Sequence, residues 1–123
     1  MCRILISINP EYVEKILDGT KRFEFRKIEC KVPVEEIVIY CTSPVMKVVG
    51  TATVRRVITG IPEDIWKQTK EYAGISKQFF DEYYGGRRKA VAFELCEVKK
   101  FEEPRDLGYY GVSSAPQSFV YVY

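Results

Sequence analysis

Lys21, Glu24 and Arg26 form a close group of opposite charges in a sequence of 123 residues. Phe23 and Phe25 alternate with the charged residues, which predicts a half-buried strand with Glu24 and Arg26 on one face. The cations suit a phosphate-bearing ligand, and the carboxylate has the chemistry of a general base. The alternative is an exposed charge ladder of little energetic consequence. The phenylalanines favour a binding site, because they would anchor the strand and hold its charged face rigid.

The absence of histidine limits the chemistry that this group could perform. It excludes Ser-His-Asp and Cys-His triads, histidine zinc sites and a neutral imidazole base. The four cysteines, at positions 2, 30, 41 and 96, contain no C-x-x-C pair that would indicate a zinc knuckle or a thioredoxin motif. The sequence also lacks a P-loop and a G-x-G-x-x-G fingerprint. We therefore expect no metal and no cofactor.

The net charge of +2 comes from 19 basic and 17 acidic residues, far below the excess of a protein that coats nucleic acid non-specifically. The distribution is uneven. Residues 21–31 contain five basic and two acidic side chains, and Arg87, Arg88 and Lys89 form a second basic run. If the basic runs share a face, that face suits a phosphate-bearing ligand. Solvated strand ends are the alternative interpretation.

Hydrophobic periodicity predicts six strands and three short helices. We expect strands over residues 3–8, 22–27, 34–42, 45–58, 89–98 and 119–123, and helices over 10–18, 62–73 and 76–84. Gly50 within a strand indicates a bulge or a close approach of another backbone. Helices inserted between strands indicate an α+β fold with a curled sheet or small barrel. We expect one domain over residues 1–123, with a ligand groove where helices meet the sheet.

Aromatic residues make up 14% of the chain, and most are expected in the core. A single-stranded or flipped base is recognised by stacking and by hydrogen bonds to its edge, which suits aromatic rings beside Lys, Arg, Ser and Gln. Rings near predicted loop ends or on the second predicted helix are the better candidates for stacking, namely Tyr40, Trp66, Tyr72 and Phe119. Phe79, Phe80, Tyr83 and Tyr84 are expected to form the apolar face of the third helix.

The stretch from Ile4 to Lys27 resembles the signature of the ASCH domain family, in which a Gly-x-Lys-x-x-Glu-x-Arg motif follows the first helix. Residues 19–26 match this motif. Residues 39–45, 49–50 and 116–119 are similar to a subgroup of small stand-alone proteins that is also seen as the PUA-like part of predicted transcription regulators. The resemblance covers nearly the whole chain. It implies a PUA-like curled β-barrel, related to modules that bind RNA or modified nucleobases.

The resemblance implies a binding module for RNA or a modified nucleotide, with Lys21, Glu24 and Arg26 lining the cleft. In this interpretation Glu24 accepts from a base amino group, while Lys21 and Arg26 meet phosphate or carbonyl oxygens. The cleft is expected to be completed by Tyr40, Ser43 and Phe119.

An alternative function is also implied, because some small ASCH proteins are similar enough to suggest an amidohydrolase of N4-acetylcytidine that uses Lys, Thr and Glu. Lys21 matches the lysine, but Glu24 stands where that group has its nucleophilic threonine. A metal-independent enzyme would then use Lys21 and Glu24 to activate water. Binding without catalysis is therefore preferred. A third interpretation is an accessory domain of transcription regulation, which would need a partner to reach DNA because no clear helix-turn-helix is present.

The N-terminal sequence starts a predicted strand rather than the apolar region of a signal peptide. No apolar stretch approaches the roughly 20 residues that a membrane span requires. We therefore expect a cytoplasmic protein without a membrane partner.

Overall fold

The turn residues and β-rich runs of the sequence produce six strands and three α-helices in the computed structural model, which describes residues 2–123. The strands are β1 (Arg3–Ile8), β2 (Phe23–Arg26), β3 (Glu36–Cys41), β4 (Lys47–Gly60), β5 (Ala90–Arg105) and β6 (Phe119–Val122). The α-helices are α1 (Pro10–Asp18), α2 (Pro62–Thr69) and α3 (Lys77–Tyr84). Two short 3-10 helices, η1 (Lys70–Tyr72) and η2 (Leu107–Tyr110), follow α2 and β5.

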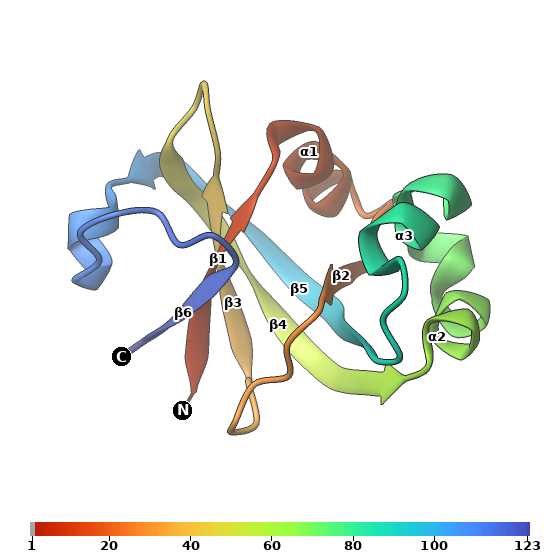
Figure 1. Ribbon diagram of the computed structural model, residues 1–123. Coiled ribbons are helices and arrows are strands. Elements are labelled where there is room, and N and C mark those ends of the chain that lie inside the picture. Colours follow the sequence, from red (N-terminus) through yellow and green to blue (C-terminus); the bar gives the residue numbers. More distant parts are fainter. Residues whose placement is uncertain (1) are drawn as a thin grey trace.

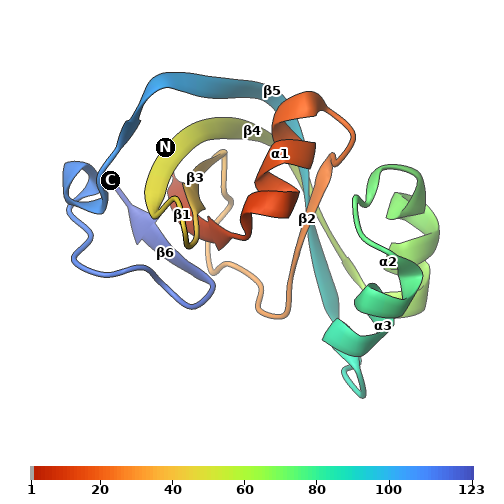
Figure 2. The same ribbon diagram turned by 90° about the horizontal axis from the view of Figure 1, so that it is seen from above.

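The six strands form one curled sheet in the order β2-β5-β4-β3-β1-β6. Strands β1 and β3 are parallel, and the other neighbours are antiparallel. Figure 2 shows the long strands β4 and β5 curving around β1 and β3, and Figure 1 shows α2 and α3 beside β2. The sheet is an open half-barrel, since β2 and β6 remain its two edges. The predicted α+β fold with a curled sheet is confirmed.

Local sequence signals set the ends of the helices. Pro10 occupies the first turn of α1, and Gly19 ends the helix with a φ of 87°. Ser76 caps α3, because its hydroxyl accepts a hydrogen bond from the backbone N–H of Phe79 at 3.0 Å. The sequence predicted one helix over residues 62–73, but α2 ends at Thr69, whose φ of −118° departs from α-helical geometry. The chain continues there as η1.

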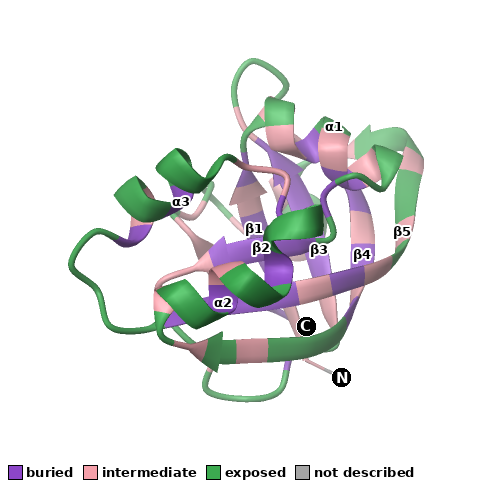
Figure 3. Cartoon of the chain, turned by 90° about the vertical axis from the view of Figure 1, so that its right-hand side faces the viewer, coloured by how far each residue is buried: buried purple, intermediate pink, exposed green. Residues whose placement is uncertain are grey.

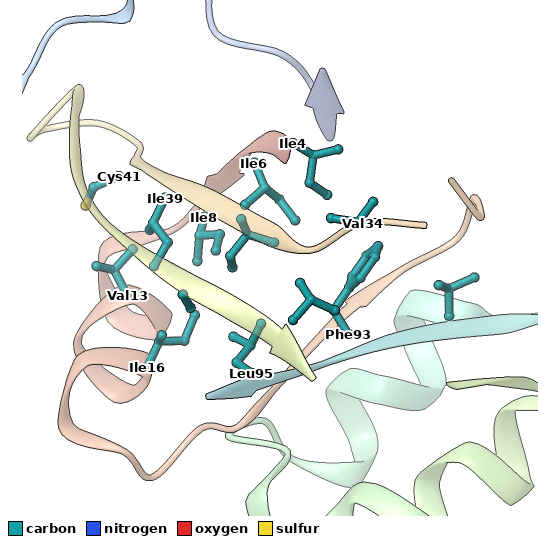
Figure 4. Close-up of a cluster of buried hydrophobic side chains, with 14 residues drawn as sticks. Ile4, Ile6, Ile8, Val13, Ile16, Val34, Ile39, Cys41, Phe93 and Leu95 are labelled. Carbon is teal, nitrogen blue, oxygen red and sulfur yellow. The ribbon is translucent and has the colours of Figure 1, made fainter. Parts of the chain in front are cut away.

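The sheet and the helices enclose three hydrophobic clusters. In the first, Val13 and Ile16 of α1 pack toward the strands against residues such as Ile8 and Leu95 (Figure 4). The second fills the space between β2, β5, α2 and α3, and the third lies around Leu5 and Val38. Buried residues follow the strands, whereas half of α2 and more than half of α3 are exposed (Figure 3). Both phenylalanines of β2 are buried in the second cluster, which anchors this short edge strand.

Gly50 allows β4 and β5 to approach closely. A Cβ atom at this position would lie 2.3 Å from the backbone oxygen of Lys99. The β4–β5 register also shifts between Val48 and Gly50. Both features predicted from Gly50, an irregular pairing and a close backbone approach, are confirmed.

Among residues 2–123, none of the helices is long and apolar enough to cross a membrane.

Candidate functional site

A cavity of about 220 Å³ lies where β1, β2, α1 and α3 meet. Its charged residues are Lys21, Glu24 and Arg26, which come from β2 and the turn before it. Its aromatic wall comes from both helices and consists of Tyr12, Phe79 and Tyr83. Ser7, Asn9 and Gln117 add uncharged polar groups. The cavity thus combines three buried or half-buried charges with an aromatic wall.

Lys21 is almost fully buried, with 2% of its surface exposed. Its Nζ donates a hydrogen bond to the backbone oxygen of Ala73 at 2.6 Å and lies 3.8 Å from Oε1 of Glu24. The ammonium is also 5.0 Å from the centroid of the Phe25 ring. Burial lowers the pKa of Lys21, and the nearby Glu24 carboxylate opposes this effect only in part. Lys21 is therefore more easily deprotonated than a surface lysine.

Gly74 makes room for the Lys21 side chain. Its φ is +71°, and a Cβ at this position would lie 2.4 Å from Cγ of Lys21. The backbone oxygen of Gly74 also accepts a hydrogen bond from Lys15 Nζ at 3.3 Å. The segment after η1 therefore fixes the position of the buried lysine through both the Ala73 carbonyl and the glycine surface.

Glu24 is also buried, and its contacts converge on one carboxylate oxygen. Oε1 lies 3.8 Å from Lys21 Nζ, 3.6 Å from Arg26 Nη1, and accepts a hydrogen bond from the Phe25 backbone at 3.2 Å. Among residues 2–123, no hydrogen bond is donated to Oε2. Glu24 therefore has one oxygen held by the protein and a second that can accept from a ligand.

Arg26 connects β2 to β1. Its Nη1 donates to the backbone oxygen of Phe25 at 2.6 Å, and its Nη2 donates to that of Ser7 at 2.8 Å. Its Nε is buried without a partner among the residues that the structure describes. The guanidinium is thus held in a fixed position and supplies positive charge to the cavity.

The aromatic wall lies between α1 and α3. The rings of Tyr12 and Phe79 are 5.8 Å apart at an angle of 57°, and 43% of Phe79 is exposed. Burial raises the pKa values of Tyr12 and Tyr83, so both hydroxyls are neutral at physiological pH. Neutral rings at the mouth of a charged cavity provide surfaces on which a nucleobase can stack.

The structure brings together only half of the residues predicted to bind a ligand. Lys21, Glu24 and Arg26 line one cavity. Tyr40 is buried in the third hydrophobic cluster, Ser43 is exposed in the turn before β4, and Phe119 on β6 packs against the first cluster. None of these three is among the residues that line this cavity within the described chain.

The other two rings proposed for stacking also lie outside the cavity. Trp66 packs on Phe80 with ring centroids 5.0 Å apart, and Tyr72 lies beneath the guanidinium of Arg22 at 4.0 Å. Phe79 and Tyr83, which do line the cavity, were expected only on the apolar face of the third helix. These rings could have been identified from the two adjacent apolar stripes of α3. Phe80 and Tyr84 form the stripe that is buried in the core, whereas Phe79 and Tyr83 form the second stripe.

Within residues 2–123, no group of three or more histidine, cysteine, aspartate or glutamate residues could hold a metal ion. The four cysteines are free thiols.

Comparison with known proteins gives a consistent family assignment. The family model of the ASCH domain matches residues 6–105. The chain is 34% identical over 95 residues to an ASCH domain-containing ribonuclease of Zymomonas mobilis, covering 74% of this chain and 62% of that protein. It is 31% identical over 120 residues to a Ureaplasma parvum protein named ATP synthase subunit alpha, covering 97% of this chain but 15% of the relative. A Ureaplasma parvum protein named large ribosomal subunit protein uL22 is 32% identical, with 39% of its length covered. The chain therefore spans less than two thirds of each of these relatives.

The crystal structure of the ASCH protein from Zymomonas mobilis has the same fold. It superposes with a TM-score of 0.87 at 29% sequence identity, covering 98% of this chain and 87% of that chain. A variant of the same protein, with a serine replaced by alanine, gives a TM-score of 0.88 at 28% identity, covering 98% of this chain and 88% of that chain.

Proposed function

Because the chain belongs to the ASCH domain family, we propose that its cavity binds one nucleotide, free or within an RNA. The observation that carries this proposal is the Glu24 carboxylate, which is buried between Lys21 and Arg26 and whose Oε2 accepts no hydrogen bond in the described chain. An acceptor in this position suits the amino group of cytosine, adenine or guanine. The two cations balance the carboxylate and suit carbonyl or phosphate oxygens of the same nucleotide.

The size and walls of the cavity support a single base as the ligand. Its volume of about 220 Å³ is below that of cavities which enclose drug-sized ligands. Tyr12, Phe79 and Tyr83 offer ring surfaces beside the charged groups. A base in a duplex could not enter such a cavity without leaving its stack. The arrangement therefore favours a free nucleotide or a single-stranded segment over a double helix.

Glu24→Gln tests this binding mode. The amide keeps the size of the side chain but removes its charge, and we expect affinity for cytidine and adenosine to fall roughly tenfold or more. Uridine has no amino group, so its affinity should change less. Isothermal titration with the three nucleosides measures these differences, with thermal unfolding as a check on the fold. Glu103→Gln is the matched control, because Glu103 is exposed on β5 and does not line the cavity. Equal affinities of wild type and Glu24→Gln for cytidine would contradict the proposal.

Catalysis at the same site is the second candidate function. Two observations favour it: burial lowers the pKa of Lys21 despite the opposing effect of Glu24, and a relative is named a ribonuclease. A deprotonated Lys21 amine could accept a proton from a ribose hydroxyl or from water. With N4-acetylcytidine, activated water would attack the acetyl carbonyl, and breaking the C–N bond would release acetate and cytidine.

The two reactions are distinguished by their products. We expect an active protein to cleave 5′-labelled single-stranded RNA or to deacetylate N4-acetylcytidine, with turnover falling to background in Lys21→Met. Gel electrophoresis follows the first reaction and chromatography of the nucleosides follows the second. Turnover of neither substrate would remove the catalytic candidate, while leaving the binding proposal to the titration.

A further inference from the structure

The second half of β4 has no neighbouring strand on one side. Within residues 2–123, β3 pairs with β4 as far as Thr53, and one further hydrogen bond joins the Val54 N–H to the oxygen of Glu35 at 2.8 Å. Strand β4 then continues to Gly60 with β5 as its one partner in the described chain. Figure 1 shows this end of β4 running beyond β3 toward α2. Residues 55–60, here named the open segment of β4, therefore form a free sheet edge.

The open segment directs the backbone groups of two residues away from β5. The Leu95 N–H of β5 donates at 2.8 Å to the residue that precedes β2, so by alternation the β5 residues opposite Arg56 and Ile58 face β4. Val57 and Thr59 alternate with these positions, and their N–H and C=O groups point to the free side. Among residues 2–123, no hydrogen bond is formed by these four groups. They are available to a strand from another molecule.

A hollow of about 550 Å³ adjoins the open segment and is lined on its other side by residues 29–35. Val34 and Val54 form its buried part, whereas 48% of Val32 and 37% of Val57 are exposed. None of the residues that line it in the described chain is aromatic, so a nucleobase would find no ring on which to stack. A free sheet edge beside an aliphatic hollow is typical of surfaces that bind an extended peptide.

Two arginines give the open segment an excess of positive charge. Arg56 Nε donates to Oε1 of Glu94 at 2.6 Å, and Arg55 Nη1 lies 3.8 Å from Oε2 of the same carboxylate. One carboxylate thus serves two guanidinium groups, although the side chains of Arg55 and Arg56 remain 67% and 63% exposed. The hollow has three further charged residues: Lys31, Glu35 and Glu29, which pairs with Lys89. Acidic side chains of a partner would meet Arg55 and Arg56 beside the free edge.

A second copy of this chain is a less suitable occupant. Antiparallel pairing of two open segments would bring four guanidinium groups together with only two Glu94 carboxylates. Like charges at short distance oppose association. An acidic partner, in contrast, would supply the carboxylates that Arg55 and Arg56 lack.

We propose that the open segment binds an extended, acidic segment of another protein as an added β-strand. The backbone of this segment pairs with Val57 and Thr59, one apolar side chain enters the hollow, and acidic side chains contact Arg55 and Arg56. The inference is independent of the proposed nucleotide site, since the hollow and that cavity share no lining residue in the described chain. The protein would then hold a nucleotide and a protein partner on separate surfaces.

Labelled peptides test the charge of the partner. Fluorescence anisotropy at low salt uses three short peptides in which valine alternates with glutamate, serine or lysine. We expect the glutamate peptide to bind at least roughly tenfold more tightly than the lysine peptide. In Arg55→Ser/Arg56→Ser this preference should fall to about twofold or less. Lys99→Ser/Lys100→Ser is the matched control, because both lysines are exposed on β5 opposite the half of β4 that β3 covers, and it should bind like wild type.

Amide hydrogen exchange in the wild-type protein locates the added strand. The Val57 and Thr59 N–H groups should exchange at least roughly tenfold more slowly once the glutamate peptide is bound, because they become hydrogen-bonded. The N–H groups of Arg56 and Ile58 already face β5 and should change less. Nuclear magnetic resonance measures each amide separately. The measurement uses no substitution, so it does not depend on the stability of a variant.

Several outcomes would overturn the inference. Equal affinity for the glutamate and lysine peptides, or binding of neither, would exclude an acidic partner. Unchanged exchange at Val57 and Thr59 in saturating peptide would exclude an added strand. If no peptide bound and Arg55→Ser/Arg56→Ser lost affinity for an eight-nucleotide single-stranded RNA, the surface would belong to nucleic acid. A wild-type dimer in sedimentation, with the Val57 and Thr59 amides protected in the absence of peptide, would assign the free edge to a second copy.

Discussion

Gly74→Ala is expected to lower the free energy of unfolding by about 3 kcal/mol and to weaken cytidine binding at least roughly tenfold. The methyl group would be placed 2.4 Å from Cγ and 2.5 Å from Cβ of Lys21, and alanine is strained at a φ of +71°. Because the contact is with the stem of Lys21 rather than with its mobile end, the side chain must move as a whole. Its ammonium would then leave both the Ala73 carbonyl and Glu24. Urea unfolding and nucleoside titration measure the two effects.

Gly111→Ala separates backbone strain from the displacement of Lys21. Gly111 has a φ of +73°, but nothing lies within 4 Å of the position its Cβ would take. This variant should lose about 1 kcal/mol of stability and keep its nucleoside affinity. If Gly74→Ala behaved like Gly111→Ala in both measurements, the role of Gly74 in positioning Lys21 would be disproved.

Lys21→Met is expected to weaken cytidine binding and to destabilise the fold. Methionine fills a similar volume, and it removes an ammonium whose burial disfavours the charged form. Removing this buried charge stabilises the variant. Against this, the Ala73 carbonyl loses its hydrogen-bond donor, which costs about 1–3 kcal/mol. We expect a net loss of roughly 2 kcal/mol near pH 7, because methionine also leaves the buried Glu24 carboxylate with Arg26 as its one remaining cation among residues 2–123. Cytidine affinity should fall at least roughly tenfold, since Glu24 would lose one of its two cations.

The pH dependence of stability identifies the buried ammonium directly. The pKa of Lys21 in the folded protein lies below its usual 10.5, so between these two values the unfolded chain binds more protons than the folded one. Stability contributed by Lys21 therefore rises with pH across this interval. The free energy of unfolding of wild type should therefore increase relative to that of Lys21→Met as pH approaches 10.5. Urea unfolding at several alkaline pH values measures this difference, and tyrosine ionisation, common to both proteins, cancels. A difference that is constant with pH would contradict the burial of a charged lysine.

The elements that carry the site were largely predictable from local patterns. Alternating aromatic and charged residues predicted the strand that became β2, and Pro10 and Gly19 marked the ends of α1. Each of these signals depends only on residues that are close together in the chain, so the sequence alone reveals it. Gly50 likewise indicated the close approach of β4 and β5, because only glycine leaves space for another backbone there.

The burial of Lys21 was not predictable, because it depends on residues far along the chain. Position 21 alone indicates a charged side chain at a turn, which is normally exposed. The carbonyl that binds its ammonium is 52 residues away, in a segment whose course is set by η1 and Gly74. No local pattern connects these two segments.

The choice of aromatic residues was limited by a different ambiguity. On α3, Phe79 and Tyr83 are one turn apart, and so are Phe80 and Tyr84, which gives two adjacent apolar stripes. Periodicity does not distinguish a stripe that packs on a core from one that lines a cavity. Tyr40 shows the converse. Its position at the end of a predicted strand suggested a site beside a loop, but the alternation of residues along β3 places it in the third hydrophobic cluster, on the opposite face of β3 from the first cluster.

The hydrogen bonds that position Arg26 also affect how this protein meets other copies of itself. Strand β2 is an edge of the sheet, and an open edge exposes backbone groups that can pair with a strand from another molecule. Here the backbone oxygen of Phe25, which points away from β5, accepts a hydrogen bond from the Arg26 guanidinium. A side chain of the same strand thus occupies an acceptor that an incoming strand would need. The strand that carries Glu24 and Arg26 therefore has part of its open edge blocked by its own arginine.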